Sequence, residues 1–235
     1  MNIADWMDGG DPHDPARSAE QIEWLRSWAG VGSRSILDLG CGDGRTVVAL
    51  AALGHAVVGV DCNASALDRC RDRLGARPAE LVHADFASEW PAVEGPFDAV
   101  LCLGNTFMLL HDLDQATGVL RHCAASLAAD GIIVLDDIPA EFLPEVESGN
   151  WADGVNEDGT LQMIWSPDEA VFTIRTGSDV DEECWTFKRD DVLLRLWTDS
   201  TLAQVAEAAG LSGPHRVQTG PGAGAVLVMR SVQAI

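Results

Sequence analysis

A glycine-rich turn between two apolar segments constrains the fold of this chain more than any other feature. Gly40, Gly42 and Gly44 follow the apolar run at 36–39 and precede an apolar helical pattern that begins at Arg45. Glycines place no side chains where the backbone must bend sharply, and they let a ligand lie against the backbone. The helix after the turn presents unpaired N–H groups and the positive end of its dipole. The stretch therefore predicts the strand, turn and helix of a cofactor cradle.

Two acidic residues stand in register with this turn. Asp38 lies just before the first glycine, and Asp61 ends the next apolar run at 56–60. The separation of Asp61 from Gly40 is that of one βαβ unit, so its carboxylate is expected beside the turn. There it can accept hydrogen bonds from both hydroxyls of a ribose.

The glycine spacing disfavours a dinucleotide site. The fingerprint Gly-x-Gly-x-x-Gly places its third glycine at position 45, which is Arg45 in this chain. The frame here is Gly-x-Gly-x-Gly. An NAD-linked oxidoreductase is therefore the weaker enzymatic alternative, and a glycine turn without a ligand is the structural one.

With these residues the sequence resembles the class I S-adenosylmethionine-dependent methyltransferases, whose first motif is an acid followed by Gly-x-Gly-x-Gly. The resemblance implies S-adenosylmethionine as cofactor and S-adenosylhomocysteine as product. In this family an acid after the third strand binds the adenine amino group and its neighbour packs on the ring, and Asp85 and Phe86 match these roles. A helix cap is the alternative for Asp85. The implied cofactor-binding residues are Asp38, Gly40, Cys41, Gly42, Gly44, Asp61, Cys62, Asp85, Phe86 and Leu103.

The fourth predicted strand, at 97–102, delivers the sequence Leu-Gly-Asn-Thr-Phe at 103–107 to the carboxyl edge of the sheet, where ligands bind in open α/β sheets. This stretch resembles the Leu-Gly-Asn-Ser-Phe of the glycine and sarcosine N-methyltransferase branch. The histidine expected a few residues later is replaced by Leu109, with His111 two positions further on. The Asn/Asp-Pro-Pro-Tyr/Phe signature of enzymes that methylate nucleobase amines or glutamine amides does not occur here.

Three side chains near this edge are candidates for catalysis. A sulfonium methyl group is already activated, so positioning the acceptor carries most of the rate. A neutral amine needs no strong base, whereas a hydroxyl needs a base or a metal, which favours nitrogen over oxygen as the acceptor atom. Asn105 is expected to orient the acceptor, Asp137 to anchor a cationic group and His111 to act as the base. Each has a structural alternative, in which Asn105 closes a turn, Asp137 caps the following segment and His111 lies on the surface before its helix.

No metal site is predicted. Metal-dependent catechol-type methyltransferases place acids at the ends of strands four and five, and here strand five offers Asp136 and Asp137 while strand four ends in Leu-Gly-Asn. The six cysteines form no Cys-x-x-Cys pair and are expected to be packed free thiols.

Alternating strand and helix patterns from residue 35 predict an α/β fold. We expect a Rossmann-like, seven-stranded, mostly parallel sheet with helices on both faces. Helices are predicted at 15–29, 45–53, 64–74, from Leu113 to a stop at Gly131, and at 200–209. Strands are predicted at 35–39, 56–61, 80–84, 97–102, 131–135, 215–219 and 225–229.

After residue 139 this rhythm fails, and four short runs at 161–165, 170–175, 183–188 and 192–197 predict an inserted antiparallel meander. We expect three parts: an N-terminal arm and helical lid at 1–34 that includes Trp6, a methyltransferase core at 35–138 and 199–235, and a substrate cap at 139–198. The alternative for the insertion is a dimerisation flap, in which case an oligomer would form through the inserted strands. Trp151 and Trp165 are candidate cap walls, and Arg175 or Arg195 a candidate for binding a substrate carboxylate.

The formal charge of −22 argues against nucleic acid as a partner, because no Lys/Arg-rich patch is present to neutralise phosphates. A negative field favours neutral or cationic small molecules. No apolar run is long enough for a membrane span and the N-terminus is acidic, so a cytoplasmic protein without a membrane partner is expected. A cofactor-sensing or partner-binding protein without catalysis is the non-enzyme alternative.

Overall fold

The computed structural model describes residues 15–137, 154–155, 159–221 and 225–232 of the 235-residue chain. Two predictions, the lid role of Trp6 and the wall role of Trp151, lie outside the described residues.

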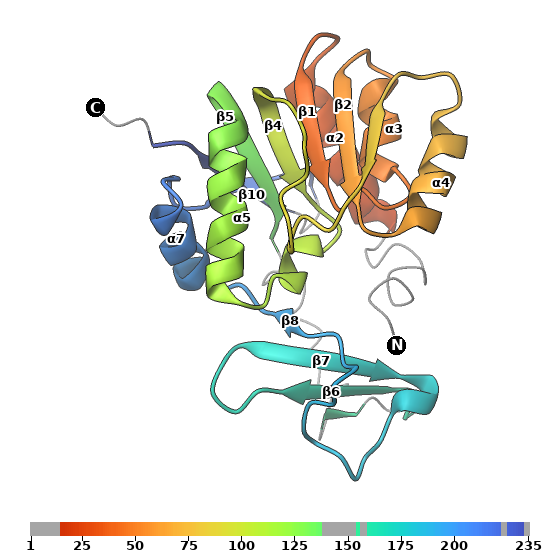
Figure 1. Ribbon diagram of the computed structural model, residues 1–235, viewed down its shortest axis with the longest axis vertical. Coiled ribbons are helices and arrows are strands. Elements are labelled where there is room, and N and C mark those ends of the chain that lie inside the picture. Colours follow the sequence, from red (N-terminus) through yellow and green to blue (C-terminus); the bar gives the residue numbers. More distant parts are fainter. Residues whose placement is uncertain (1–14, 138–153, 156–158, 222–224, 233–235) are drawn as a thin grey trace.

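A seven-stranded sheet forms the centre of the molecule, in the order β3-β2-β1-β4-β5-β10-β9 (Figure 1). The first five of these strands pair in parallel, and β10 runs antiparallel to both of its neighbours. The predicted mostly parallel sheet is thus confirmed. The strands are β1 (Ser35–Leu39), β2 (Ala56–Asp61), β3 (Glu80–His83), β4 (Phe97–Cys102), β5 (Leu127–Asp136), β9 (His215–Gln218) and β10 (Ala225–Arg230).

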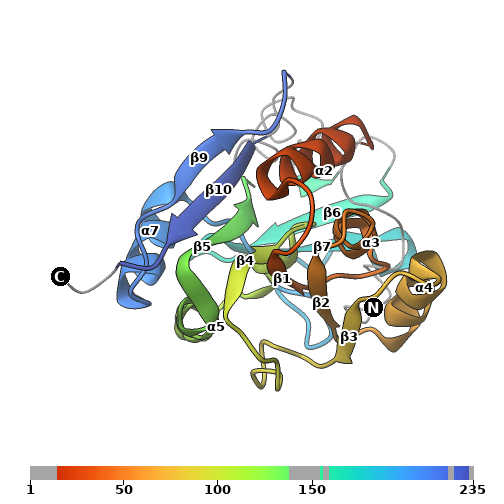
Figure 2. The same ribbon diagram turned by 90° about the horizontal axis from the view of Figure 1, so that it is seen from above.

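Helices cover both faces of this sheet, as Figure 2 shows from above. Successive strand residues alternate between the faces: Leu37 of β1 belongs to the apolar cluster beneath α5 and α7, and Ile36 to the cluster beneath α2, α3 and α4. No helix in the described ranges is long and apolar enough to cross a membrane. The helices are α2 (Pro15–Ala29), α3 (Arg45–Ala51), α4 (Ala64–Leu74), α5 (Leu113–Ser126) and α7 (Asp199–Ala208).

The junction between α5 and β5 corrects one predicted boundary. The helix ends at Ser126 instead of continuing to Gly131, and Leu127 already pairs with Phe97 of β4. The apolar periodicity runs on to Leu127, so the pattern alone did not mark the end. Gly131 has a different role, because a Cβ atom there would lie 2.8 Å from the carbonyl oxygen of Phe97.

The inserted meander has three strands, in the order β6 (Leu161–Trp165), β7 (Val171–Thr176) and β8 (Leu194–Arg195). The antiparallel pairing was predicted correctly, but the expected strand at 183–188 was wrong. Side chains take the place of a neighbouring strand there, since Gln162 donates to the carbonyl oxygens of Asp181 and Cys184 at 2.8 and 3.2 Å.

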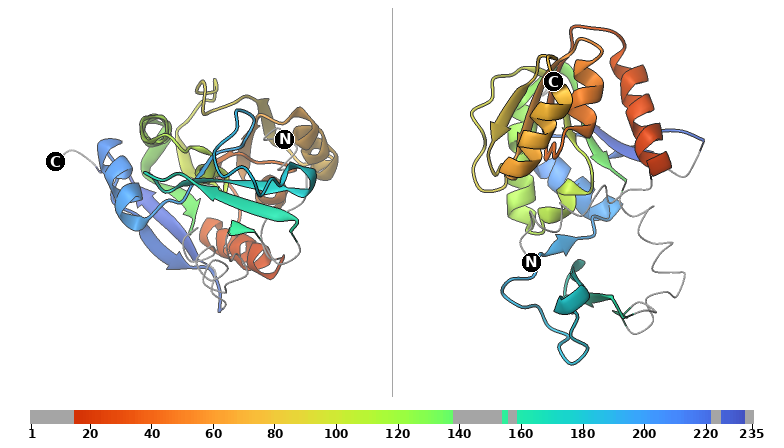
Figure 3. Two further views of the ribbon diagram at one scale, coloured as in Figure 1. Left: turned by 90° about the horizontal axis from the view of Figure 1, so that it is seen from below. Right: turned by 90° about the vertical axis from the view of Figure 1, so that its right-hand side faces the viewer.

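This smaller sheet lies beyond the end of the main sheet at which η1 (Thr106–Leu109) follows β4 (Figures 1 and 3). Met108 of η1 packs in one apolar cluster with Phe172 and Leu194 of the smaller sheet. The indole Nε1 of Trp197 donates to the carbonyl oxygen of Phe107 at 3.1 Å. The meander is therefore fastened directly to the segment that was predicted to face the ligand.

Candidate functional site

The glycine turn between β1 and α3 has the backbone conformation that its sequence predicts. All three glycines have positive φ angles, 73° at Gly40, 54° at Gly42 and 87° at Gly44. A Cβ atom at Gly40 would lie 2.4 Å from Cγ2 of Thr106, and one at Gly44 would lie 2.3 Å from Sγ of Cys70, whereas Gly42 faces open space. The outer glycines thus permit close packing, and the central one leaves room above the turn.

Asp61 connects the end of β2 to this turn. Its Oδ2 accepts the backbone N–H of Gly42 at 2.8 Å, and its Oδ1 accepts the backbone N–H of Asn63 at 2.8 Å. The residue is 4% exposed. These two bonds fix the plane of the carboxylate, and each oxygen keeps a lone pair that can accept a ligand hydroxyl.

A cavity of about 860 Å³ opens beside this carboxylate. Its volume is in the range of small-molecule and cofactor sites. Six predicted site residues border it: Gly40, Asp61, Cys62, Asp85, Phe86 and His111. The other bordering residues are Ala84, Ala87, Ser88, Thr106, Leu109, Leu110, Gln115 and residues 189–193.

Asp85 caps its own turn at the end of β3. Its Oδ1 accepts the backbone N–H of Ala87 at 3.1 Å, and its Oδ2 accepts the hydroxyl of Ser88 at 2.5 Å. The structural alternative named for the residue was a helix cap, but the segment that Asp85 caps is a turn and not a helix. Because Asp85 is exposed and borders the cavity, its adenine-binding role stays a prediction.

Asp38 is a buried acid beneath the turn, 2% exposed. Burial raises its pKa to about 7; Arg45 acts in the opposite direction, and Asp61 and Asp136 add to the increase. Within the described part of the chain, Oδ2 of Asp38 and Nη1 of Arg45 are buried without a hydrogen-bond partner.

A polar network continues from Arg45 across the end of the sheet. Nη2 of Arg45 donates to Oε1 of Gln21 at 2.7 Å, and Nε2 of Gln21 donates to Oδ1 of Asp136 at 2.7 Å. Gln21 was not predicted as a site residue, because its only signal in the sequence is a polar side chain among the apolar positions of its helix. The network ties α2 to the start of α3 and the end of β5.

Asn105 stands at the end of this network. Its backbone N–H donates to Oδ2 of Asp136 at 2.7 Å, and its φ angle is 60°, in the left-handed region. Its Oδ1 is buried and has no hydrogen-bond partner among the described residues. Asn105 thus closes a turn, as its structural alternative stated, and also presents an unsatisfied acceptor near the sheet edge.

Asp137 forms an ion pair with Arg216. It is fully buried, and its two oxygens accept from Nε and Nη2 of Arg216 at 2.5 and 3.0 Å. Nη2 of the same guanidinium also reaches Asp199 at 3.0 Å. Asp137 does not border the cavity, so the structure does not bring it to the predicted ligand.

His111 borders the cavity and is partly exposed. Nε of Arg195, a residue of β8, donates to its carbonyl oxygen at 2.5 Å. The two arginines considered for a substrate carboxylate are both paired instead, Arg195 with Glu169 and Arg175 with Asp191. Trp165 packs against Phe172 with a ring-centroid distance of 4.7 Å and does not border the cavity.

The last two predicted cofactor residues, Cys41 and Leu103, pack in the apolar core next to the turn. A Cβ at Gly59 would lie 2.8 Å from Sγ of Cys41. All six cysteines are free thiols, and four of them are buried. Among the described residues, no group of three His, Cys, Asp or Glu side chains is placed to hold a metal ion.

The sheet order, the glycine turn and the acids that follow β2 and β3 define the class of this protein. Its fold is that of the Rossmann-like S-adenosylmethionine-dependent methyltransferases. Residues 36–131 match the family described as methyltransferase domain. The predicted family resemblance and fold class are therefore confirmed.

Similar proteins include two curated methyltransferases and a solved structure. The chain is 35% identical over 122 residues to the cypemycin N-terminal methyltransferase of a Streptomyces species, which covers 52% of this chain and 49% of that protein. It is 29% identical over 124 residues to the glycine/sarcosine N-methyltransferase of Aphanothece halophytica, covering 52% and 47%. The chain spans about half the length of the curated relatives it matches. The CcbJ methyltransferase from Streptomyces caelestis shares the fold with a TM-score of 0.64 at 21% identity, covering 95% of this chain and 98% of that one.

Proposed function

We propose that this protein transfers a methyl group from S-adenosylmethionine to a small-molecule acceptor. The observation that carries the proposal is the convergence of Gly40 at the start of the glycine turn, the oriented carboxylate of Asp61 and Phe86 on one cavity. When bound, the cofactor supplies an activated methyl group for in-line displacement.

The residues present fit such a cofactor. In this proposal Asp61 would accept the ribose hydroxyls, and Phe86 would offer an apolar ring to the adenine, since both residues border the cavity. Asp38 and Arg45 each carry a buried polar atom without a partner among the described residues. They would pair with the ammonium and carboxylate of the amino-acid end, since buried polar groups are normally satisfied.

Asn105 and His111 are the side chains that we assign to the acceptor. The unsatisfied Oδ1 of Asn105 would accept a hydrogen bond from the acceptor and turn its lone pair toward the methyl group. His111, at the border of the cavity, would take up a proton. Asp137, held on both oxygens by Arg216, acts in our proposal as a structural residue and not as an anchor for a cation.

The proposal favours nitrogen over oxygen as the acceptor atom. The cavity border carries a histidine but no cluster that could hold a metal among the described residues, and an amine needs less activation than a hydroxyl. The net charge of −22 favours a neutral or cationic acceptor. Cofactor sensing without catalysis is the alternative function of the same site, because cofactor binding does not depend on the acceptor residues Asn105 and His111.

Isothermal titration with S-adenosylmethionine and S-adenosylhomocysteine tests cofactor binding. Micromolar-range binding that Asp61→Ala abolishes is the expected result. Absence of binding to the unaltered protein would overturn the proposal, and a parallel fluorescence titration with NADH would then test the oxidoreductase alternative.

Catalysis requires a separate measurement. Formation of S-adenosylhomocysteine is followed against a panel of amines, phenols and carboxylates, with Asn105→Gly as the site variant. Glycine suits the left-handed backbone at this position, so the variant is expected to fold normally and to lose turnover at least tenfold. Cofactor binding together with inactivity toward the whole panel would favour the sensing role.

A further inference from the structure

Residues 189–193 of the insertion border the same cavity as the residues predicted to hold a nucleoside. Within this segment, Val192 and Leu193 are partly buried apolar side chains. Phe86, predicted to pack on the adenine, lines the cavity with them, whereas Asn105 does not. His111, assigned above to the acceptor, borders this cavity as well. The segment therefore lies at the cavity that the nucleoside end of the cofactor is predicted to occupy.

One buried guanidinium holds this segment in place. Nε and Nη2 of Arg175, on β7, donate to Oδ1 and Oδ2 of Asp191 at 3.0 and 2.8 Å. The side chain of Arg175 is 3% exposed and that of Asp191 is 9% exposed. Two parallel charge-assisted bonds of this kind fix both the position and the orientation of the carboxylate.

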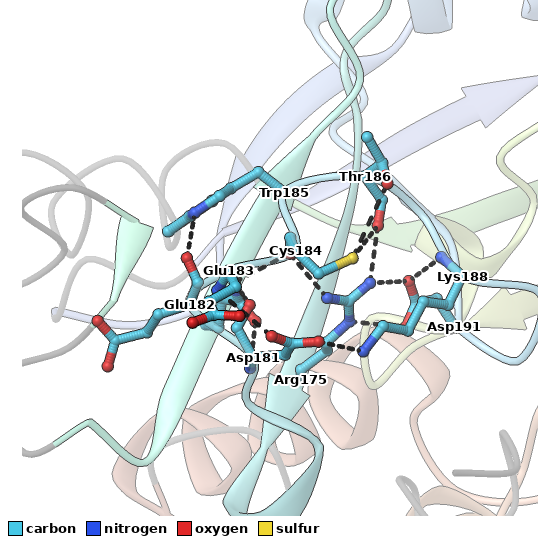
Figure 4. A network of polar contacts seen from close by, with 10 residues as sticks. Arg175, Asp181, Glu182, Glu183, Cys184, Trp185, Thr186, Lys188 and Asp191 are labelled. Atoms are coloured by element: carbon cyan, nitrogen blue, oxygen red, sulfur yellow. Dashed lines mark hydrogen bonds and ion pairs between the residues drawn. The ribbon is translucent and has the colours of Figure 1, made fainter.

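The same guanidinium also organises the chain that leads to the cavity wall (Figure 4). It donates to the carbonyl oxygens of Cys184 and Thr186 at 3.0 and 2.8 Å, and the backbone N–H of Lys188 donates to Asp191 at 2.6 Å. Burial raises the pKa of Asp191, but the bonds from Arg175 and Lys188 outweigh it and lower that pKa. Arg175 thus ties three points of an irregular segment to a strand of the smaller sheet.

We propose that the Arg175–Asp191 pair positions residues 189–193 as a wall over the nucleoside end of the cofactor. The insertion then contributes to cofactor affinity, beyond any part in selecting the acceptor. This inference rests on the proposed function. Arg175 and Asp191 are positioning residues in it, and Leu193 is the side chain that meets the ligand.

Calorimetry with S-adenosylhomocysteine and with 5′-methylthioadenosine, which lacks the amino-acid end, tests the inference on Asp191→Asn and Leu193→Ser. Both variants are expected to bind both ligands about tenfold more weakly, since each loses apolar contact with the nucleoside. Melting temperatures are measured alongside, because Asp191→Asn also weakens a buried ion pair. Leu193→Ser removes the wall without touching that pair.

Lys188→Ala is the matched control. It removes the exposed ion pair between Nζ of Lys188 and Asp181, 2.9 Å long on the same segment, and keeps the backbone N–H that binds Asp191. This variant is expected to bind both ligands as the unaltered protein does. Normal nucleoside binding by Leu193→Ser would overturn the inference while the proposed function stands. Failure of the unaltered protein to bind either ligand would overturn both.

Discussion

The carboxylate of Asp61 accepts the backbone N–H of Gly42 at 2.8 Å, which joins the end of β2 to the middle of the glycine turn. Gly42 has a φ angle of 54° and open space where a side chain would be. The bond therefore holds the turn open in the conformation in which its backbone can meet a ligand. Asp61 therefore holds the turn in place and also borders the cavity of the candidate site.

Asp61→Asn is expected to impair stability and cofactor binding together. The amide presents an NH₂ group toward backbone N–H donors, so about 2 kcal/mol of unfolding free energy is lost. The affinity for S-adenosylhomocysteine should fall at least tenfold. Asp68→Asn is the control, because Asp68 is 73% exposed and its one ion pair among the described residues is with Arg71 on the same helix. Chemical denaturation and calorimetry measure both effects, and an Asp61→Asn variant that behaves like Asp68→Asn would contradict the prediction.

The glycine frame and the apolar periodicity were sufficient to predict the turn, the mostly parallel sheet and the position of Asp61. These features are local, since a strand, a turn and a helix follow from residues within about ten positions of one another. The turn at residues 103–107 was also placed correctly, because the carboxyl ends of parallel strands meet at one edge.

Gly40→Ala is expected to be more damaging than Gly42→Ala. Both sites have left-handed backbones, which cost an alanine about 1 kcal/mol. At Gly40 the new methyl group would also meet the side chain of Thr106 at 2.4 Å, so a total of about 3 kcal/mol is expected. Thermal unfolding of both variants measures the difference. Adding Thr106→Ala to Gly40→Ala should recover part of the loss, and equal melting temperatures for the two single variants would contradict the packing argument.

Asp137→Asn is expected to lower stability and to leave cofactor affinity unchanged. The fully buried carboxylate receives two bonds from Arg216, and the amide replaces charged acceptors by one neutral acceptor and a donor, at a cost of about 2 kcal/mol. The matched control is Asp199→Asn, which removes the 61% exposed partner of the same guanidinium and should cost no more than about 0.5 kcal/mol. Equal losses for the two variants in urea denaturation would show that burial does not decide the effect.

Long-range pairing explains what the sequence could not reveal. Asp137 and Arg216 are distant along the chain, as are Gln21 and Asp136, and no periodicity connects them. The insertion shows the same limit, because the segment at 183–188 has a strand-like composition but its carbonyl groups are taken by Gln162 and Arg175. A local pattern shows that a segment is apolar and extended, whereas its hydrogen-bond partners depend on the tertiary fold.

The free energy of unfolding should depend on pH through the titration of Asp38. Burial raises the pKa of this acid from 3.8 in the unfolded chain to about 7 in the folded protein. Between these values the folded state keeps a proton that the unfolded state has lost. The contribution of Asp38 is therefore fully present below about pH 4 and declines by about 1 kcal/mol per unit as the pH rises toward 7.

Asp38→Asn cannot titrate, so the stability of the unaltered protein relative to this variant should fall over that window and level off near pH 8. Asp72→Asn, on the exposed face of α4, should run parallel to the unaltered protein. Urea denaturation at pH 5, 6, 7 and 8 measures all three, and a constant difference between the unaltered protein and Asp38→Asn would show that Asp38 is ionised throughout.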